Sequence, residues 1–577
     1  MTNIKKIFPR VILLGFIIAL IIFAYWELPN TFFQQDEWQG FAENIYYQSL
    51  GVAGIFNHFL PSDAISHFNP LSVLFGIIEF LLLYINFNLY AWQSIIVHIL
   101  NACLVYYFVY NFLKSRKIAF IAALFFGVNS IPSQAVTWVA TVSSYEIPTA
   151  FVILSLIFFN KFIVQKEHKK RNLLSSLTTL FISLLFHEIG IFLFVFYPIV
   201  FFLYVKDGWK KMLPTFLYGM ILLLSIFFLI RAPFFFISSL HSVPTVTDIS
   251  RPSISVYPYR IISISFKSFA DSFFPEKTLI NISDQVIRLA YPQFVAIDNA
   301  PNPYVSQLIV FDLVSYILTF ILLCFLFLIS RMIKEKEIRE GLISSIIFVS
   351  TSLLPYAFVS GKAGYASILE PKFFYISSIG TSVIIAITFY YILVKFSKSW
   401  VRKFIIFLIL VSYFIIHMNA IKINVEKLVK MSIPIKSFLT IIKSSYSKLP
   451  QSVIFYTMSN KAYYGMPDDE KTLPVEIGFG QMLMVWYQAD EKFPGCFYKD
   501  AFFLDILTQG YRTCDGRGFG YFRNYDKLIS AVRQNKVPVE DIIAYSWTDE
   551  TKDFKDITKT VRLRVIQSLQ SENGIKK

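Results

Sequence analysis

The sequence predicts an α-helical polytopic membrane protein that also carries a small α/β domain outside the cytoplasm. The 577 residues are 55% hydrophobic and 18% aromatic, and a soluble domain of this size cannot bury that much apolar surface. The mean hydropathy of +0.56 points the same way. Basic residues form short clusters between long apolar runs. Beyond residue 420, charged residues, Gly and Pro return and short strand-like runs appear.

The basic clusters orient the chain, because short basic loops beside membrane spans mark the cytoplasmic side. Placing every cluster on that side predicts a cytoplasmic N-terminus, an uncleaved first span and about eleven spans in the inner (plasma) membrane. The net charge of +15 arranged in this way excludes nucleic-acid binding as its explanation. The expected spans are 11–26, 89–113, 118–131, 143–163, 172–186, 189–205, 212–231, 307–330, 341–359, 373–394 and 403–419.

Two long loops, 27–88 and 232–306, fall on the outer side in this topology. The first contains an apolar run, 67–87, which cannot cross the membrane without moving the basic turn 114–117 to the outside. We therefore expect a helix that lies along the outer interface, with Pro70 in its first turn. A second interfacial element is expected near 259–274, in the longer loop.

The region 421–577 is expected to fold as a separate extracytoplasmic α/β domain. Buried strands are predicted at 452–458 and 541–546, and an amphipathic helix at 524–534. Cys496 and Cys514 fall in this region. An extracytoplasmic pair favours a disulfide, although the spacing alone is equally compatible with two free thiols.

The acidic pair Asp36-Glu37 follows the first expected span by a few residues. This position is the outer membrane face, the depth at which lipid-linked substrates present their polar heads. Asp36 is either a functional group or, alternatively, a solvated loop acid or a helix cap beside Glu37. Charged residues are common near span ends and rarer at functional depth.

A series of motifs along residues 1–420 follows a recognisable order. It comprises the acidic pair, Asn69-Pro70-Leu71-Ser72 at the interfacial helix, the segments 101–108 and 122–132, Trp138 followed by Glu146, His187-Glu188, and the segments 353–355 and 370–380. This order resembles the GT-C superfamily of integral-membrane glycosyltransferases, closest to its TMTC-like and bacterial branches. The sequence departs from the family pattern at Asn69, His187 and Lys372-Phe373, where the family often has a basic residue, Lys and Arg-Tyr.

The resemblance implies transfer of a sugar from a polyprenyl-phosphate donor to a glycan, lipid or protein acceptor on the extracytoplasmic face. The attacking acceptor must lose a proton, and Asp36 or Glu37 is the expected general base. Residues expected to bind substrate are Glu146, His187, Glu188, Arg231, Arg260, Glu370 and Lys372.

These substrate-binding assignments have structural alternatives. Glu146 also suits the start of a helix, where the helix dipole favours an acid. His187-Glu188 also suits a polar hairpin tip, and the cations Arg231, Arg260 and Lys372 also suit contacts with ordinary lipid headgroups.

The sequence contains no phosphate-binding glycine loop, zinc-type Cys/His spacing or nucleophile elbow, so neither a cofactor nor a metal is predicted. Two other classes of function remain open. A transporter or flippase of lipid-linked glycans has a similar number of spans, but more often shows internal repeats and broken helices. A non-enzymatic envelope assembly protein uses the C-terminal domain as its working part and tolerates loss of Asp36.

Overall fold

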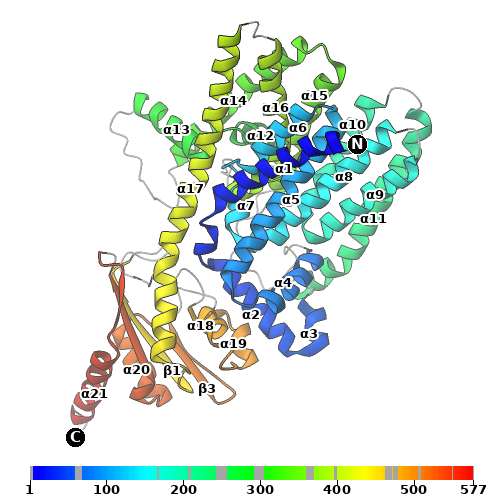
Figure 1. Ribbon diagram of the computed structural model, residues 1–577. Coiled ribbons are helices and arrows are strands. Elements are labelled where there is room, and N and C mark those ends of the chain that lie inside the picture. Colours follow the sequence, from blue (N-terminus) through cyan, green and yellow to red (C-terminus); the bar gives the residue numbers. More distant parts are fainter. Residues whose placement is uncertain are drawn as a thin grey trace. The chain divides into compact units, whose positions relative to one another are not determined.

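The computed structural model describes residues 4–58, 68–165, 168–205, 209–241, 257–290, 305–358, 369–395, 399–461, 471, 473, 479–503, 509–548 and 550–575 (Figure 1). The chain forms two compact units. The transmembrane unit comprises Met1–Trp26, Phe59–Phe75 and Tyr90–Val425. The sheet-bearing unit comprises Glu27–His58, Gly76–Leu89 and Glu426–Lys577. Most of the first expected outer loop therefore belongs to the same unit as the C-terminal sheet.

The transmembrane unit is helical throughout its described length. Its helices are α1 (Ile4–Tyr25), α5 (Phe87–Leu113), α6 (Arg116–Gly127), α7 (Gln134–Thr137), a π-helical turn (Val142–Glu146), α8 (Ile147–Val164), α9 (Lys169–Phe186), α10 (Leu193–Tyr204), α11 (Trp209–His241), α12 (Tyr257–Asp271), α13 (Glu276–Ala290), α14 (Val305–Met332), α15 (Lys336–Ser352), α16 (Ser377–Lys395) and the first part of α17 (Trp400–Ser445). Short 3₁₀ turns occur at Glu188–Phe192, Leu354–Phe358 and Pro371–Phe374.

Among the described residues, 7 helical segments are long and apolar enough to cross a membrane. Three shorter apolar helices, Pro70–Leu83, Glu188–Tyr204 and Ser377–Leu393, coincide with the expected interfacial helix and with two expected spans. The fold class is thus confirmed, whereas the number of eleven spans stays a prediction. The helix α4 (Pro70–Leu83) begins at the proline that the sequence placed in its first turn.

Two helices do not end where the expected spans end. The helix in the span expected over 118–131 ends at Gly127, and the helix that contains the span expected over 403–419 continues to Ser445. Hydropathy falls after residue 419 because charged residues enter the sequence, but Lys and Glu are good helix formers, so the helix itself continues. The end of an apolar run therefore does not mark the end of this helix.

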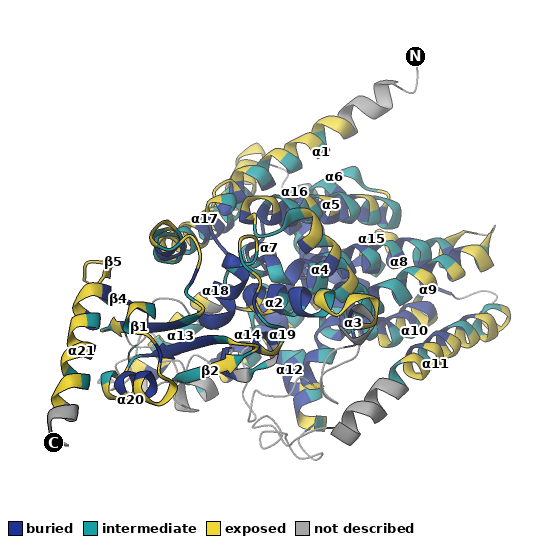
Figure 2. Cartoon of the chain, turned by 90° about the horizontal axis from the view of Figure 1, so that it is seen from below, coloured by how far each residue is buried: buried dark blue, intermediate teal, exposed yellow. Residues whose placement is uncertain are grey.

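The longer outer loop is largely helical where it is described, because α11 extends to His241 and α12 and α13 follow. The helix α12 confirms the element expected near 259–274 and packs against α14. Its polar side chains Arg260, Ser263 and Lys267 are buried, whereas Ile262 is 71% exposed (Figure 2). An apolar outer face and a polar inner face suit a helix whose surroundings are lipid.

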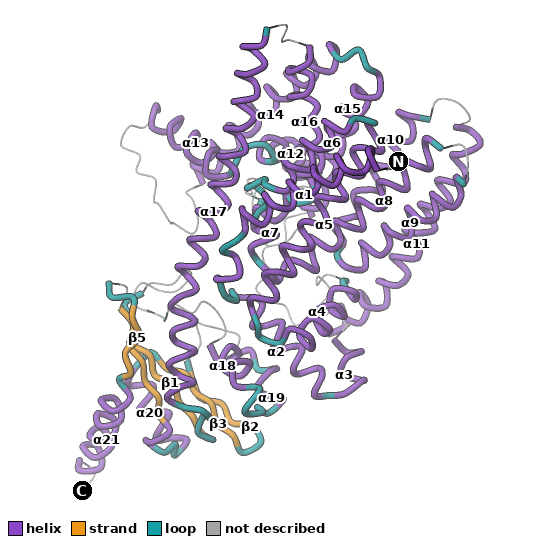
Figure 3. The backbone as a smooth tube through the Cα atoms, viewed as in Figure 1, coloured by secondary structure: helices purple, strands orange, loops and turns teal. Residues whose placement is uncertain are grey.

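The sheet-bearing unit is built on a five-stranded sheet with the order β2-β3-β1-β4-β5 (Figure 3). The central strand β1 (Ser452–Ser459) is parallel to β3 (Arg517–Phe522) and β4 (Ile542–Thr548). The outer strands β2 (Gly510–Cys514) and β5 (Asp553–Asp556) are antiparallel to their neighbours. The two expected strands are confirmed as β1 and β4, and the expected helix as α20 (Tyr525–Asn535).

Helices cover both faces of this sheet. Leu528 of α20 and Val565 of α21 (Thr558–Ile575) pack with the strands in one apolar core. On the other face, the Phe438 ring of α17 lies 5.4 Å from Tyr545. The helix α18 (Phe479–Tyr487) covers the same face, where the Phe479 ring lies 5.3 Å from that of Phe455. Parallel strands are typically buried on both faces in this way.

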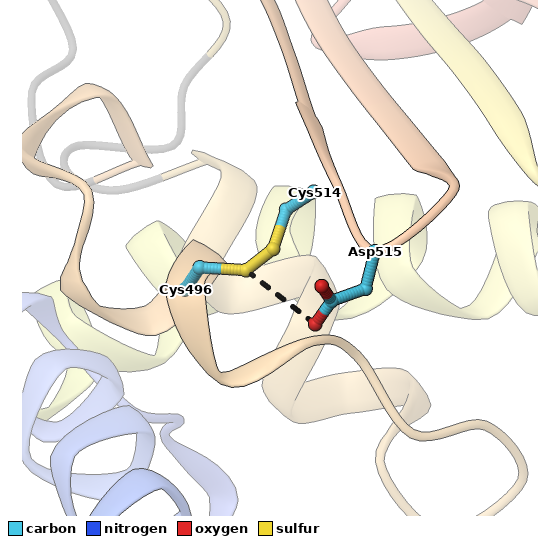
Figure 4. Close-up of side chains that lie close together, drawn as sticks. All are labelled: Cys496, Cys514 and Asp515. Carbon is cyan, nitrogen blue, oxygen red and sulfur yellow. Dashed lines mark hydrogen bonds between the residues drawn. A yellow bond between two sulfur atoms is a disulfide. The ribbon is translucent and has the colours of Figure 1, made fainter.

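Cys496 and Cys514 are joined by a disulfide, with their Cα atoms 6.5 Å apart (Figure 4). Cys496 lies in α19 (Gly495–Lys499), and Cys514 ends β2. The tight turn from β2 to β3 uses Asp515 and Gly516, whose φ values of 48° and 74° suit a two-residue hairpin of the Asp-Gly kind. The disulfide therefore ties α19 to the tip of this hairpin.

Candidate functional site

The acidic pair opens the helix α2 (Gln35–Ser49), and its two carboxylates have different surroundings. Glu37 completes a capping box: its Oε2 accepts a hydrogen bond of 3.1 Å from the backbone N–H of Gln34. Its side chain is buried at 5% exposure, whereas Asp36 is exposed. Because a capping box uses its carboxylate to satisfy the helix N-terminus, Glu37 has a structural task. Asp36 is left facing the surface.

A cluster of aromatic rings packs against the first turn of α2. The ring of Phe33 is T-shaped against Trp38 at 5.4 Å, Phe41 at 4.9 Å and Phe87 at 5.1 Å. Phe33 is only 1% exposed. Edge-to-face packing of this kind stabilises a fixed arrangement, so the backbone that carries Asp36 is held rigidly within the sheet-bearing unit.

A second acid, Glu43, lies on the same face of α2 as Asp36. The two residues are seven positions apart, a spacing that places side chains on one side of a helix. Burial raises the pKa of the Glu43 carboxyl, and a hydrogen bond of 2.9 Å from Gln39 partly offsets this effect. The sequence interpretation missed Glu43, although the spacing was visible. Two carboxyl groups in unlike surroundings on one face suit general acid–base chemistry.

A shallow pocket of about 450 Å³ lies in the same unit, beside the short helical turn Leu28–Asn30 and the end of α4. Its wall combines the aromatic residues Phe32 and Tyr84 with Asn86, Asn88 and Lys436. Lys436 donates a hydrogen bond of 2.7 Å to the carbonyl oxygen of Asn30. Phe32 also contacts Trp38 with a ring separation of 5.8 Å, so the pocket adjoins the aromatic cluster beneath the acidic pair.

Glu146 has a different setting, inside the transmembrane unit. It ends the π-helical turn before α8, is 0% exposed, and accepts a hydrogen bond of 2.9 Å from Ser94 at Oε1. The sequence placed it at a helix entrance facing a cavity, but the structure places it in the packed interior. π-Helical turns often occur at functional positions, and nothing in the sequence showed that this acid would be enclosed.

A chain of buried polar side chains continues from Glu146. Asn101 donates to the backbone carbonyl of Glu146 at 2.9 Å and to the hydroxyl of Tyr375 at 3.1 Å. His98 contacts the Gly127 carbonyl through Nε2 at 3.0 Å and the Tyr375 hydroxyl through Nδ1 at 2.8 Å. Since a carbonyl only accepts, Nε2 carries the proton and Nδ1 accepts from Tyr375. The network joins α5 to the end of α6, to the π-helical turn before α8 and to the segment before α16.

The other predicted residues of the transmembrane unit form two ion pairs. Arg231 is paired with Glu188. Lys372 lies 2.8 Å from the carboxylate of Glu370, and its ammonium sits 4.2 Å from the centre of the Trp138 ring. Arg231 and Lys372 each have a predicted acid as partner. The acid orients the cation, and the pair carries no net charge.

Aromatic contacts connect these two ion pairs. The Tyr145 ring lies 5.4 Å from His187 and 6.1 Å from Phe373. His187 is adjacent to Glu188, and Phe373 is adjacent to Lys372. The structure thus brings His187, Glu188, Glu370 and Lys372 into one region, although they lie far apart in the sequence.

Arg260, the third predicted cation, is 2% exposed on α12. Two turns further along the same helix, Lys267 is 0% exposed and forms an ion pair of 2.6 Å with Asp312 of α14. The sequence interpretation missed this ion pair. A buried lysine–aspartate pair depends on which helices pack together, so no local pattern reveals it.

Within the described part of the chain, the group of side chains with metal-ligand spacing is Cys496, Cys514 and Asp515. The Asp515 carboxylate lies 4.0 Å from the Cys496 sulfur. Both sulfurs belong to the disulfide (Figure 4), and a metal requires thiolate sulfur. This group therefore serves as a structural staple.

Comparison with known proteins found similar solved structures but no match in sequence. No family model matches it, and no curated protein matches it in sequence. It is similar to the crystal structure of ArnT from Cupriavidus metallidurans bound to undecaprenyl phosphate, with 11% identity, 94% of each chain covered and a TM-score of 0.45. It is also similar to the Archaeoglobus fulgidus oligosaccharyltransferase tethered with an acceptor peptide, with 14% identity, 78% of this chain and 62% of that chain covered, and a TM-score of 0.41.

Both similarities have an identity below 25% and a TM-score below 0.5. Function is therefore argued below from this chain's own residues.

Proposed function

We propose that the protein is a GT-C-type membrane glycosyltransferase that moves a sugar from a polyprenyl-phosphate donor to an acceptor on the extracytoplasmic face, with Asp36 as the general base. The observation that carries this proposal is the unequal placement of the acidic pair. Glu37 caps α2 while Asp36 remains exposed on a rigid aromatic base. A general base must reach the proton it removes, and Asp36 is the member of the pair that is presented for this task.

In the proposed reaction, Asp36 takes the proton of the acceptor as the acceptor attacks the anomeric carbon of the donor. A bond forms between the acceptor and this carbon, and the bond from the carbon to the phosphate oxygen breaks. The polyprenyl phosphate leaves with the bonding electrons. Developing charge on a phosphate oxygen is stabilised by fixed donors, and Arg231, Lys372 and Arg260 are the proposed donors.

The ion pairs of these cations suit such a role. Glu188 and Glu370 hold Arg231 and Lys372 in place before the donor arrives. An arginine already fixed in orientation loses less conformational entropy when it binds a phosphate. The ArnT structure to which the chain is similar contains undecaprenyl phosphate, so this carrier is the first donor lipid to test.

The test is sugar transfer from a panel of radiolabelled polyprenyl-phosphate sugars to cell-envelope acceptors by the purified, folded chain. We expect Asp36→Asn to lower the rate by about 10²-fold or more, as is usual for loss of a general base. Glu37→Gln should change transfer and stability little, because the side-chain oxygen of Gln still accepts the hydrogen bond of the capping box. The matched control is Asp526→Asn, which changes the second residue of α20, the position that Asp36 occupies in α2.

Full activity of Asp36→Asn would overturn the assignment of the base. Absence of transfer by the wild-type chain with every donor would overturn the glycosyltransferase proposal itself. Movement of lipid-linked glycans across reconstituted vesicles would then favour the flippase alternative.

A further inference from the structure

A cavity of about 180 Å³ lies inside the transmembrane unit, among α5, α8, α10, α15 and α16. None of the residues assigned to sugar transfer lines it. Its walls are mainly aromatic and aliphatic, with Phe108, Phe159 and Phe348 among them. Its rim carries the charged residues Lys114, Glu337 and Glu340.

Small residues at two helix crossings create the shape of this cavity. A Cβ atom on Gly341 would lie 2.4 Å from Leu113, and one on Gly380 would lie 2.7 Å from Val349. The helix α15 therefore approaches both α5 and α16 closely, and only glycine fits at these two points. Ser344, Ser345 and Gly380 then face the phenylalanine rings without filling the space between them.

The polar atoms of this wall are already satisfied within the protein. The Ser344 hydroxyl is 2.7 Å from that of Tyr204, and the Ser345 hydroxyl donates to the carbonyl of Gly341 at 2.8 Å. The interior therefore presents apolar surface to a ligand. An apolar cavity of about 150 Å³ stays dry and accepts benzene, so this one has room for part of a hydrocarbon chain.

The rim has a distinct charge pattern. Lys114 is exposed at the turn after α5, where its φ of 53° ends the helix, and Glu337 is exposed at the start of α15. Glu340 is half-buried one turn further along α15. Lys336 lies 3.9 Å from Glu340 on the same helix, so the rim carries carboxylates and ammonium groups side by side. This arrangement suits a headgroup that carries both a positive amine and a negative phosphate. A purely anionic headgroup would lack the positive group that complements Glu337.

We propose that this cavity is a binding site for an amine-bearing phospholipid of the phosphatidylethanolamine class. An acyl-chain segment occupies the space between the phenylalanine rings, the ammonium group contacts Glu337 and Glu340, and the phosphate faces Lys114. The turn after α5 and the loop before α15 are among the basic loops that mark the cytoplasmic side.

The test is retention of lipid by the purified full-length chain, measured by native mass spectrometry after titration with phosphatidylethanolamine, phosphatidylcholine or phosphatidylglycerol of identical acyl chains. We expect wild type to retain phosphatidylethanolamine about tenfold better than the other two, since charge-assisted hydrogen bonds to the primary amine are lost in both. Val200→Phe, which fills the cavity, should abolish retention.

Two matched controls separate this site from general lipid contact. Val195→Phe makes the same change on α10 at a position that is 44% exposed and does not line the cavity, and it should retain lipid as wild type does. Glu337→Gln should remove the preference for the amine headgroup, whereas Glu335→Gln, two residues earlier and outside the rim, should keep it.

Because Glu337 is exposed, its substitution leaves the fold intact and keeps the test decisive even if Val200→Phe fails to fold. Equal retention of all three lipids by wild type would overturn the proposal. Unchanged headgroup preference in Glu337→Gln would overturn it as well.

Discussion

The two units of the molecule expose opposite kinds of side chain. In the transmembrane unit, Leu229 and Phe320 are 74% and 64% exposed, while Glu146 and Lys267 are fully buried. In the sheet-bearing unit, apolar residues and tyrosine pack between the sheet and α20 and α21, and the charged residues of α20 face outward. The same chain therefore follows one rule in two solvents: each unit exposes what its solvent accepts.

This contrast explains why the polar networks lie where they do. Lipid offers no hydrogen bonds, so polar side chains in the transmembrane unit are paired with each other. Glu146 with Ser94 and Lys267 with Asp312 are examples. In the sheet-bearing unit, water satisfies the exposed charges, and apolar contacts dominate the core between the sheet and its helices.

The largest expected effect comes from breaking a buried pair of the transmembrane unit. Lys267→Met leaves the Asp312 carboxylate without its ammonium partner in a buried site, and we expect a loss of about 3–5 kcal/mol in unfolding free energy. The measurement is denaturant unfolding in detergent. The double variant Lys267→Met/Asp312→Leu should recover most of this loss, because replacing both charges by apolar groups is often neutral. Equal destabilisation of both variants would show that the pair has no special role.

The second prediction compares a lysine substitution on the exposed surface of each unit. Ile321, near the middle of α14, is 55% exposed, and Ile321→Lys places a charge on the expected lipid face at a cost of about 3 kcal/mol. Gln534→Lys, on the exposed side of α20, should change stability by less than about 0.5 kcal/mol. Membrane insertion and unfolding of the two variants provide the comparison. Similar small effects for both would mean that this face of α14 contacts water.

The third prediction concerns the disulfide between Cys496 and Cys514. The described residues of the transmembrane unit contain no such bond. Replacing Cys496 and Cys514 by Ser removes a link between residues 18 positions apart and should cost about 3 kcal/mol. The effect should appear as lower thermal stability of the sheet-bearing unit and faster proteolysis there. The matched control is Cys103→Ser/Cys324→Ser, which changes two free cysteines and should leave that unit unaffected.

Much of the fold could be predicted from sequence because its signals are local. Apolar runs gave the long helices, and alternating or continuous apolar runs gave β1, β4 and α20. The continuation of α17 to Ser445 was missed. Hydropathy indicates which residues lie in the membrane, whereas helix propensity indicates whether the backbone stays helical. A charged helix beyond a span looks like the start of a loop when only hydropathy is read.

The candidate site was predictable in its residue types but not in its pairings. Arg231 meets Glu188 across 43 positions, and Lys267 meets Asp312 across 45. Such partners depend on which helices pack together, and a single sequence does not contain that information. The different roles of Asp36 and Glu37 were easier to predict, because Gln34 and Glu37 have the spacing of a capping box. Gln is not a usual N-cap residue, so the spacing was not interpreted in this way.

The smallest expected effect tests a helix end in the unit that faces water. The Asn524 side chain caps α20 by accepting a hydrogen bond of 3.0 Å from the backbone N–H of Lys527. Asn524→Ala should cost about 1 kcal/mol, while Asn524→Asp, which keeps the acceptor, should cost almost nothing. Thermal unfolding of the sheet-bearing unit measures both. Because α20 ends are solvated, water replaces part of the lost bond, whereas no water is available around Lys267. A cost for Asn524→Ala as large as that for Lys267→Met would contradict the distinction between the two solvents on which this comparison rests.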